Sequence, residues 1–413
     1  MRISRELHIA APEPHVAVYA QSPTYTALDG FTLIEAVKEE VRTRSGRYYD
    51  RRIYRRRSAD NGVTWGAEEP LHCLSDNDIE TGCRVRMVPM HYLEPDTGLL
   101  VSLYATSQRA GSDTGFNGAG DMTSRTGRLH YEISRDGAHT WEPHGPVIAV
   151  GDEYDDVHWG PGLHYGKNGA TADLAPWVSL GEGAFACGIS RQPLDKAGDI
   201  YSPYGGYFLE VVCLRGRWTE DLSDIEWEMG RPISVGPDLS TVGCCEPAMC
   251  SLGEGRLWGT MRCQGSPERD LPSLKFTSLS EDGGLTWSEP EPLRYDDGEV
   301  VSSPASLAQL HRPSYSDKLY WIGNVHHEPV CGQTPRYPLY IAQVDPYRLC
   351  LLRDTLRVID DRAEGQPEDV RFTNWGSYED RVTGELVLTL PIEPKTNWDE
   401  LTSDCYRYRI AFS

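Results

Sequence analysis

The sequence has no long hydrophobic run. No segment of the 413 residues approaches the length of a membrane span, and the first twelve residues contain no apolar stretch of signal-peptide length. It also has no Gly/Ser linker, no block of like charges and no low-complexity segment. We therefore expect one domain over residues 1–413 in the cytoplasm, or a secreted protein if a signal peptide has been removed.

Basic residues are also scarce relative to acidic ones. The chain has 40 Lys and Arg against 62 Asp and Glu, a net charge of −22. This charge disfavours nucleic acid and anionic membranes as partners, so an anionic substrate would have to be bound by local arginines. Phenylalanine is rare, at 7 residues against 22 Tyr and 11 Trp. Aromatic residues with a polar group suit short exposed strands and a sugar-binding cleft.

Cysteine spacing excludes two further classes of site. The 11 cysteines are scattered, apart from the neighbours Cys244 and Cys245, and no two form a C-x-x-C pair. An odd number without paired spacing argues against a zinc site and against a disulfide framework. We expect neither a metal nor an organic cofactor.

One phrase, S-x-D-x-G-x-T-W, occurs three times. Its copies are Ser58–Trp65, Ser134–Trp141 and Ser280–Trp287. In the middle copy, Gly137 directly follows the Asp, and Ala138 stands at the position that is Gly in the other two copies. The pattern predicts a hairpin turn in which the Asp carboxylate accepts backbone N–H groups, Gly takes the positive φ, and the Trp is buried where the next strand begins.

The spacing of the copies predicts a repeat architecture. The first two copies start 76 residues apart, and the next interval of 146 residues is about twice that. Trp218–Trp227 lies near the place of the missing copy, and turn-then-strand signals recur at Gly98, Gly255 and Gly384. A unit of about 70 residues fits a four-stranded antiparallel blade. We predict an all-β chain that forms a six-bladed β-propeller.

With these turns, the chain resembles the sialidase superfamily, whose six-bladed propellers carry such Asp-box turns. The resemblance implies that the boxes lie at the end opposite the active site, so Asp60, Asp136 and Asp282 are structural. A second match is Cys245-Glu246-Pro247, followed 16 residues after the Glu by Arg262. In the family, this Glu partners a tyrosine nucleophile, and the Arg is one of three that bind a carboxylate.

The resemblance also implies roles for other residues. Pro335-Arg336 is similar to the strand with another clamp arginine, and Asn374–Asp380 looks like the segment that supplies the nucleophile, here Tyr378. The loop before the first Asp box implies Asp50 as the acid/base. His158-Trp159-Gly160-Pro161-Gly162 resembles a family loop that opens the third blade, and we expect His158 to contact the substrate. One departure is that Gln21-Ser22-Pro23 stands where the family has its first arginine, so Arg42, Arg44 or Arg47 would have to replace it.

Three functions follow as hypotheses. The first is an exo-acting glycoside hydrolase on an oligosaccharide or glycoconjugate that ends in a carboxylated sugar, either a nonulosonic acid or a uronate. The second is a propeller lyase or a rhamnosyl-glucuronate-cleaving enzyme, with His158 or Tyr378 as the base and Arg262 neutralising the carboxylate. The third is a glycan-binding propeller without catalysis. The sequence leaves the oligomeric state open.

Overall fold

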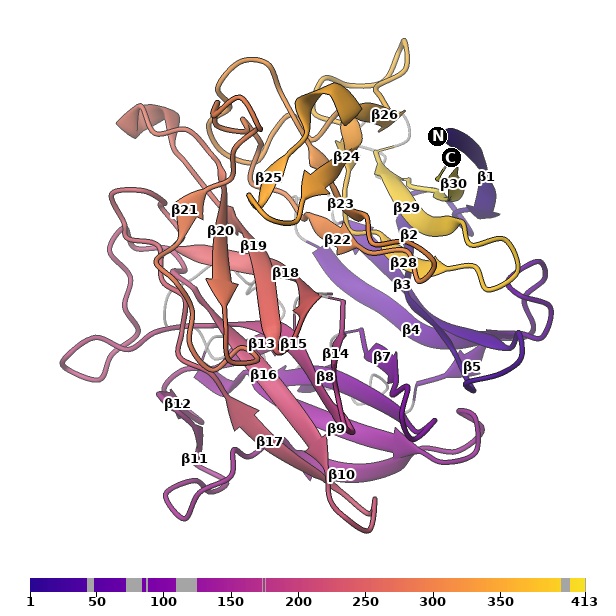
Figure 1. Cartoon of the computed structure of the whole chain (residues 1–413), viewed down its shortest axis with the longest axis vertical. Coiled ribbons are helices and arrows are strands. Elements are labelled where there is room, and N and C mark those ends of the chain that lie inside the picture. Colours follow the sequence, from indigo (N-terminus) through magenta and orange to yellow (C-terminus); the bar gives the residue numbers. More distant parts are fainter. Residues whose placement is uncertain are drawn as a thin grey trace.

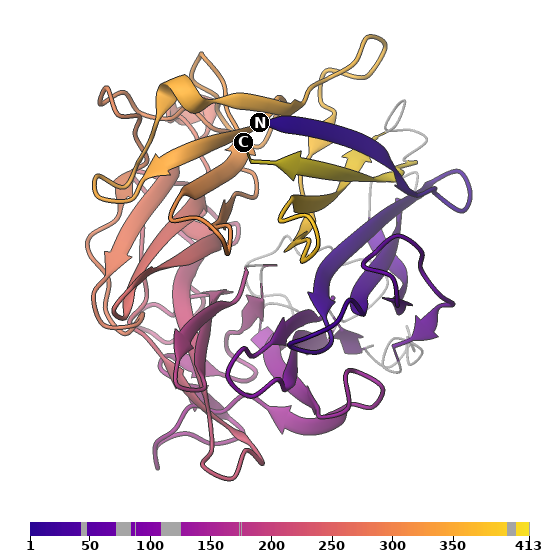
Figure 2. The same cartoon turned by 45° about the vertical axis from the view of Figure 1, so that its right-hand side comes forward.

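Apart from one two-stranded hairpin, the strands of the described residues form six antiparallel sheets that follow one another around a central axis, as Figure 2 shows. This confirms the predicted all-β, six-bladed propeller. The computed structural model describes residues 1–42, 48–71, 84–86, 88–108, 125–172, 174, 176–394 and 402–412. Among these residues, no helix has the length and apolar character needed to cross a bilayer.

The first three blades follow in chain order (Figure 1). Blade 1 consists of β2 (Val16–Tyr25), β3 (Leu33–Arg42), β4 (Tyr48–Ser58) and β5 (Glu69–Pro70). Blade 2 consists of β6 (Arg84–Arg86) and β7 (Met90–Leu93) on the inside, then β8 (Leu100–Gln108), β9 (Arg128–Ser134) and β10 (Glu142–Pro146). A hairpin of β11 (His158–Gly160) and β12 (Leu163–His164) precedes blade 3, which consists of β13 (Ala170–Ala172), β14 (Val178–Gly181), β15 (Ala184–Arg191), β16 (Glu210–Trp218) and β17 (Ile225–Met229).

The remaining blades complete the ring. Blade 4 consists of β18 (Cys244–Gly253), β19 (Arg256–Cys263), β20 (Lys275–Ser280) and β21 (Glu291–Pro292), and a short 3-10 helix, η1 (Pro267–Arg269), lies between β19 and β20. Blade 5 consists of β22 (Gln309–His311), β23 (Leu319–Asn324), β24 (Leu339–Asp345), β25 (Cys350–Leu351), the 3-10 helix η2 (Arg353–Thr355) and β26 (Arg357–Asp360). Blade 6 consists of β27 (Arg371–Phe372), β28 (Gly376–Glu379), β29 (Leu386–Glu393) and β30 (Cys405–Ala411).

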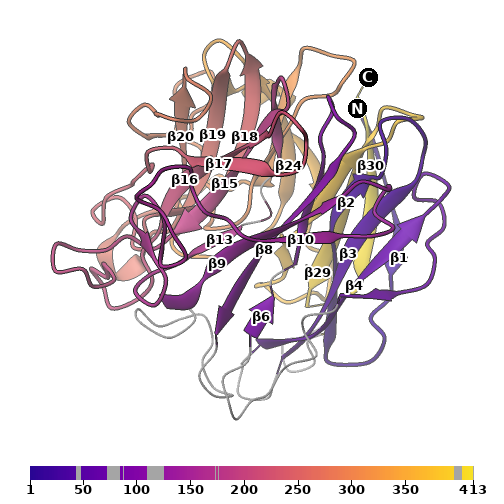
Figure 3. The same cartoon turned by 90° about the horizontal axis from the view of Figure 1, so that it is seen from below.

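The two ends of the chain close the ring. β1 (Arg2–Ile9) pairs antiparallel with β30 as the outermost strand of blade 6, with Arg2 opposite Ala411. The marks for the two termini accordingly stand side by side in Figures 1 and 3. The last blade therefore contains strands from both ends of the sequence.

The three Asp-box turns have the predicted hydrogen bonds. In each, the Ser hydroxyl donates to the Asp carboxylate, which also accepts the backbone N–H and the hydroxyl of the Thr; in the middle copy the three distances are 3.0, 2.8 and 2.7 Å. Each turn joins the third and fourth strands of its blade. The third strand runs parallel to the innermost one, so these turns all lie at the end of the propeller where the innermost strands finish.

Buried aromatic residues fill the space between blades. Trp258 of blade 4 and Trp321 of blade 5 are both fully buried in one hydrophobic cluster between those blades. The tryptophans of the Asp-box turns are less buried than the sequence predicts, since Trp65, Trp141 and Trp287 are half-buried. Trp65 and Trp141 pack against neighbouring blades, with the Trp65 ring 5.7 Å from that of His8 on β1 and the Arg55 guanidinium of blade 1 4.3 Å from the Trp141 ring. Trp287 lies beside Gly259, where a Cβ would come within 3.4 Å of its ring, and it donates its Nε1 hydrogen to Gly284 O at 3.1 Å.

Candidate active site

Charged residues gather at the end of the propeller opposite the Asp-box turns, which we call the mouth. At this end the first and third strands of each blade begin and the second strands finish. The members of the mouth cluster share this position: Tyr207 before β16, Glu246 on β18, Arg262 at the end of β19, Lys275 at the start of β20, Arg336 before β24, Arg371 at the start of β27 and Glu393 at the end of β29. They come from blades 3, 4, 5 and 6.

Glu246 is directed by a bulge in β18. The register of β18 against β19 shifts between Cys245 and Ala248, and Glu246 takes a positive φ of 47° that is unusual for a residue with a side chain. Its carboxylate accepts a hydrogen bond from Arg262 Nη1 at 2.5 Å. Backbone strain held at a charged pair is typical of functional sites. The structure thus brings the two residues of the 16-residue interval into contact.

Arg262 is only 7% exposed, so its charge depends on Glu246. Burial opposes the charged form, but the nearby carboxylate outweighs it and raises the pKa of Arg262 above its ordinary value. Lys275 lies opposite Arg262 on the neighbouring strand and is fully buried. Its ammonium donates to the carbonyl oxygens of Pro304, at 2.9 Å, and Ser306. Burial, and then the charge of Arg262, lower the pKa of Lys275 to about 7.

Arg336 is a buried cation held by neutral groups. It is 6% exposed, and its guanidinium donates to Gln333 O at 3.0 Å and Gln333 Oε1 at 3.1 Å. Gln333 in turn donates to Gln264 Oε1 at 3.1 Å, which links blades 4 and 5 across the mouth. Burial, and then the charge of Arg262, lower the pKa of Arg336. Within the described part of the chain, Arg336 forms no ion pair.

A third arginine, Arg371, enters from blade 6. Its segment runs beside that of Arg336, since Phe372 N donates to Arg336 O at 3.1 Å, and Asn324 Nδ2 donates to Arg336 O at 2.9 Å. Glu393 lies opposite Arg371 on β29 and is 3% exposed. Tyr19 of blade 1 donates its hydroxyl hydrogen to this carboxylate. Burial, and then the charge of Glu40, raise the pKa of Glu393.

Tyr207 is the tyrosine that the structure places with these charges. It is half-buried in the connection between β15 and β16. Burial raises the pKa of its hydroxyl to about 12, while the charges of Arg262 and Arg336 act to lower it and Glu246 acts to raise it. The Tyr207 hydroxyl therefore lies within electrostatic reach of one carboxylate and two guanidiniums. No motif marks Tyr207 in the sequence.

Tyr378 lies at the other end of the propeller. It stands near the end of the innermost strand β28, where a Cβ on Gly62 of the first Asp-box turn would come within 2.6 Å of its hydroxyl oxygen. Its ring packs against Tyr25 and Leu33. Seven residues separate Tyr378 from Arg371, roughly 20 Å along an extended chain. The predicted pairing of Tyr378 with Glu246 therefore needs correction, because the two lie at opposite ends of the propeller.

The other predicted site residues are placed as follows. The backbone of Asp50 lies near the start of β4, opposite Glu40, which is the mouth end of blade 1, but its side chain lies outside the described part. Arg44 and Arg47 are outside the described residues, and so is the side chain of Arg42. The place of the family's first arginine, Gln21-Ser22-Pro23, lies in the middle of β2.

His158 does not join the mouth cluster. The hairpin β11–β12 lies beside β17, the outermost strand of blade 3, as Figure 1 shows. Backbone hydrogen bonds from Ala149 to Trp159 and from Val150 to Trp227 hold it there. The His158 ring stacks on His164 at 4.3 Å, and its backbone N–H donates to Asp155. The structure therefore does not bring His158 to Arg262 and Arg336.

The mouth cluster is equipped to bind an anion. Arg262, Arg336, Arg371 and Lys275 outnumber the carboxylates Glu246 and Glu393, and burial favours the neutral form of Glu393. In a chain of net charge −22, this is a local reversal of sign. Guanidinium groups bind carboxylates through paired hydrogen bonds. No group of three or more metal-binding side chains occurs among the residues described.

Known proteins resemble this chain in structure only. No family model matches it, and no curated protein matches it by sequence. A protein of unknown function from Dyadobacter fermentans has a TM-score of 0.63 at 13% identity, with 99% of both chains covered. A sialidase from Streptococcus pneumoniae has a TM-score of 0.57 at 11% identity, covering 98% of this chain and 70% of that one. An α-L-arabinofuranosidase from Fusarium graminearum in complex with arabinobiose has a TM-score of 0.54 at 15% identity, covering 98% and 97%. At these identities the similarity shows the fold, a six-bladed propeller of the sialidase-like kind.

Proposed function

We propose that this protein is an exo-acting glycoside hydrolase that releases a terminal carboxylated sugar from an oligosaccharide or glycoconjugate. The observation that carries the proposal is Arg336, a buried guanidinium bonded to a neutral glutamine between two further arginines. A substrate carboxylate would supply the anion that this group lacks among the described residues. Sialidases among the structural neighbours and an arabinofuranosidase of similar fold support a glycoside hydrolase.

The proposed reaction uses the mouth residues in separate roles. Arg336, Arg262 and Arg371 hold the substrate carboxylate. Glu246 accepts the proton of the Tyr207 hydroxyl, and the phenolate oxygen forms a bond to the anomeric carbon as the glycosidic bond breaks. The leaving oxygen takes a proton, for which Asp50 remains the predicted donor. Water then attacks the anomeric carbon and gives a proton to the Asp50 carboxylate, while the bond from the sugar to Tyr207 breaks and the Tyr207 oxygen regains its proton from Glu246.

A tyrosine is a suitable nucleophile beside a substrate carboxylate. A carboxylate nucleophile would be repelled by that group, whereas a neutral phenol becomes charged only as Glu246 takes its proton. The charges of Arg262 and Arg336 favour the phenolate form of Tyr207. The proposal assigns to Tyr207 the role that the sequence resemblance implied for Tyr378.

The substrate class is tested with fluorogenic methylumbelliferyl glycosides. The panel contains α-N-acetylneuraminide, β-glucuronide and the neutral α-L-arabinofuranoside. We expect turnover of a carboxylated glycoside and none of the neutral one. Tyr207→Phe and Arg336→Gln should each lower kcat/KM at least tenfold. Arg256→Gln is the matched control, because Arg256 lies on the same strand as Arg262 but pairs with the exposed Glu281 at the far end.

Two outcomes would replace the proposal. Turnover of the arabinofuranoside alone would show a neutral substrate. An unsaturated uronate among the products of a uronate-containing oligosaccharide, detected by its ultraviolet absorbance, would show the lyase, in which Tyr207 takes the proton next to the carboxylate. Saturable binding of a carboxylated sugar without any product would show the binding protein.

A further inference from the structure

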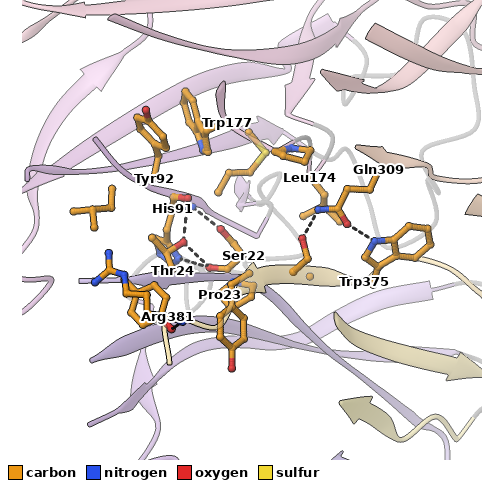
Figure 4. Close-up of a pocket in the computed structure, with 17 residues that line it drawn as sticks. Ser22, Pro23, Thr24, His91, Tyr92, Leu174, Trp177, Gln309, Trp375 and Arg381 are labelled. Carbon is orange, nitrogen blue, oxygen red and sulfur yellow. Dashed lines mark hydrogen bonds between the residues drawn. The ribbon is translucent and has the colours of Figure 1, made fainter. Parts of the chain in front are cut away.

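A cavity of about 330 Å³ lies between the innermost strands, and Figure 4 shows its lining residues. Tyr378, one of the lining residues, lies beside Gly62 of the first Asp-box turn, so the cavity reaches toward the Asp-box end. We call it the axial cavity. Its walls come from blades 1, 2, 3, 5 and 6, and no residue of the mouth cluster lines it. The volume corresponds to about ten water molecules, enough for one pyranose ring with its hydroxyl groups.

Aromatic rings form two walls of the axial cavity. Tyr92 and Trp177 are half-buried and stack on each other with ring centroids 5.3 Å apart. Trp375, which is 3% exposed, lies across from them in Figure 4. The rings of Tyr92, Trp177 and Trp375 border an open cavity that no apolar side chain fills. Aromatic walls around a small cavity are typical of ligand sites that bind flat or ring-shaped molecules.

Polar groups on the cavity wall are held in fixed positions. Gln309 accepts the Nε1 hydrogen of Trp375 at 2.5 Å and donates to Ser377. An amide has two N–H groups and two acceptor lone pairs, so each end of Gln309 retains one. On the opposite wall, Ser22 has a positive φ of 50° and its hydroxyl accepts His91 N–H at 2.6 Å. The wall is thus ordered before any ligand enters.

Arg381 provides a positive charge at the edge of the axial cavity. Its Nη1 donates to Ala27 O at 2.8 Å and to Gly30 O at 3.0 Å, and its guanidinium stacks on Tyr25 at 3.9 Å. These contacts fix the guanidinium and leave Nε and Nη2 available. Among the described residues, Arg381 forms no ion pair. An acidic group of a ligand would be bound here.

We propose that the axial cavity is a second binding site, for one acidic saccharide unit. The sugar ring lies between the Trp177 and Trp375 walls, a hydroxyl bonds the free positions of Gln309, and the carboxylate binds Arg381. None of the residues of the mouth cluster lines this site, and it requires no catalysis. It would hold an acidic glycan on the protein while the mouth remains accessible.

The test separates the two sites. Arg336→Gln serves as the background, so that binding at the mouth is weakened, and thermal melting checks that it folds. Methyl β-D-glucuronide is the probe and methyl β-D-glucoside its neutral counterpart, titrated by calorimetry and by intrinsic tryptophan fluorescence. We expect one saturable site for the glucuronide with a fluorescence change, because Trp177 and Trp375 line the cavity. The glucoside should bind at least tenfold more weakly.

Variants of the cavity decide the assignment. Trp177→Ala and Arg381→Gln should each weaken glucuronide binding about tenfold or more, as expected for a lost stacking or charged contact. Arg256→Gln, at the same end of the propeller, should not change it. Trp177→Ala in the otherwise unaltered chain should keep the kcat of the small fluorogenic substrate. No binding up to about 10 mM, or binding unaffected by both variants, would overturn the proposal. Equal binding of the glucoside would overturn the acidic class.

Discussion

The charged side chains at the two ends of the propeller differ in burial and in hydrogen bonding. At the Asp-box end, Asp60, Asp136 and Asp282 are exposed, and each carboxylate is bonded within its own turn. At the mouth, Arg262, Arg336 and Lys275 are buried, and among the described residues only Arg262 of these three has a carboxylate within hydrogen-bond distance. Charges satisfied by their own turn stabilise local structure. Charges buried together are costly, and such groups concentrate at functional sites.

Replacement of Glu246 should have the largest effect. Glu246→Gln keeps the size of the side chain but removes the base and the negative partner of Arg262, so we expect kcat to fall by about 10²- to 10⁴-fold. Steady-state kinetics on the best fluorogenic glycoside measures this. Glu281→Gln, at the Asp-box end of the same blade, is the control and should leave kcat unchanged. Similar losses in both variants would remove the distinction between the two ends.

Replacement of a turn tryptophan should affect stability and spare catalysis. Trp287 is half-buried, so Trp287→Ala should lower the free energy of unfolding by about 2–3 kcal/mol, below the cost for a fully buried ring. Urea denaturation followed by circular dichroism measures this change. Trp287→Phe should recover part of the loss. A stable Trp287→Ala protein without activity would mean that the active site lies at the Asp-box end.

A smaller effect should appear in acid. Hydrogen bonds from the Thr140 backbone N–H and hydroxyl lower the pKa of Asp136 to about 2. Because the folded pKa is below the unfolded one of about 4, the stabilisation is present above pH 4 and is lost as the pH falls toward 2. The urea midpoint of Asp136→Asn should therefore decline less between pH 4.5 and 2 than that of the unaltered chain. Equal declines would show that this carboxylate does not stabilise the turn.

The smallest effect is expected for Tyr378. Its hydroxyl is buried and has no hydrogen-bond partner among the described residues, and burial raises its pKa. Tyr378→Phe should change the free energy of unfolding by less than about 0.5 kcal/mol and should retain activity, whereas Tyr207→Phe should lose it. Melting temperature and kcat of the two variants compare the tyrosines directly. An inactive but folded Tyr378→Phe would contradict the assignment.

The fold could be predicted because its signal is local and repeated. The Asp-box phrase contains every group that forms its turn, so three copies at related spacing were sufficient to predict the blades. The same holds for Glu246 and Arg262, which lie on adjacent strands joined by one hairpin. With a sequence separation of 16 residues, Glu246 near the start of β18 comes next to Cys245, the residue that pairs with Arg262 near the end of β19.

The rest of the site depends on which end of a strand faces the mouth. In the segment from Arg371 to Tyr378, Arg371 lies at the mouth and Tyr378 toward the Asp-box end. The strand is interrupted between Phe372 and Gly376. A resemblance of short phrases did not settle which residue reaches the mouth. Tyr207 lies in a connection that carries no sequence motif. Nothing in the sequence around Lys275 distinguishes it from an exposed lysine. Their approach to Arg262 arises only when separate strands and blades come together.

The seam between β1 and β30 sets how the molecule should respond to force. Arg2 is opposite Ala411, and the pairing continues inward to Ile9 and Cys405, so both ends of the chain leave the sheet at the same point. Tension applied between the two ends would act across the seam and separate its hydrogen bonds one after another, as in a zipper. A strand loaded along its length would have to break them together. The ring should therefore open mechanically at this seam at low force, before any other blade yields.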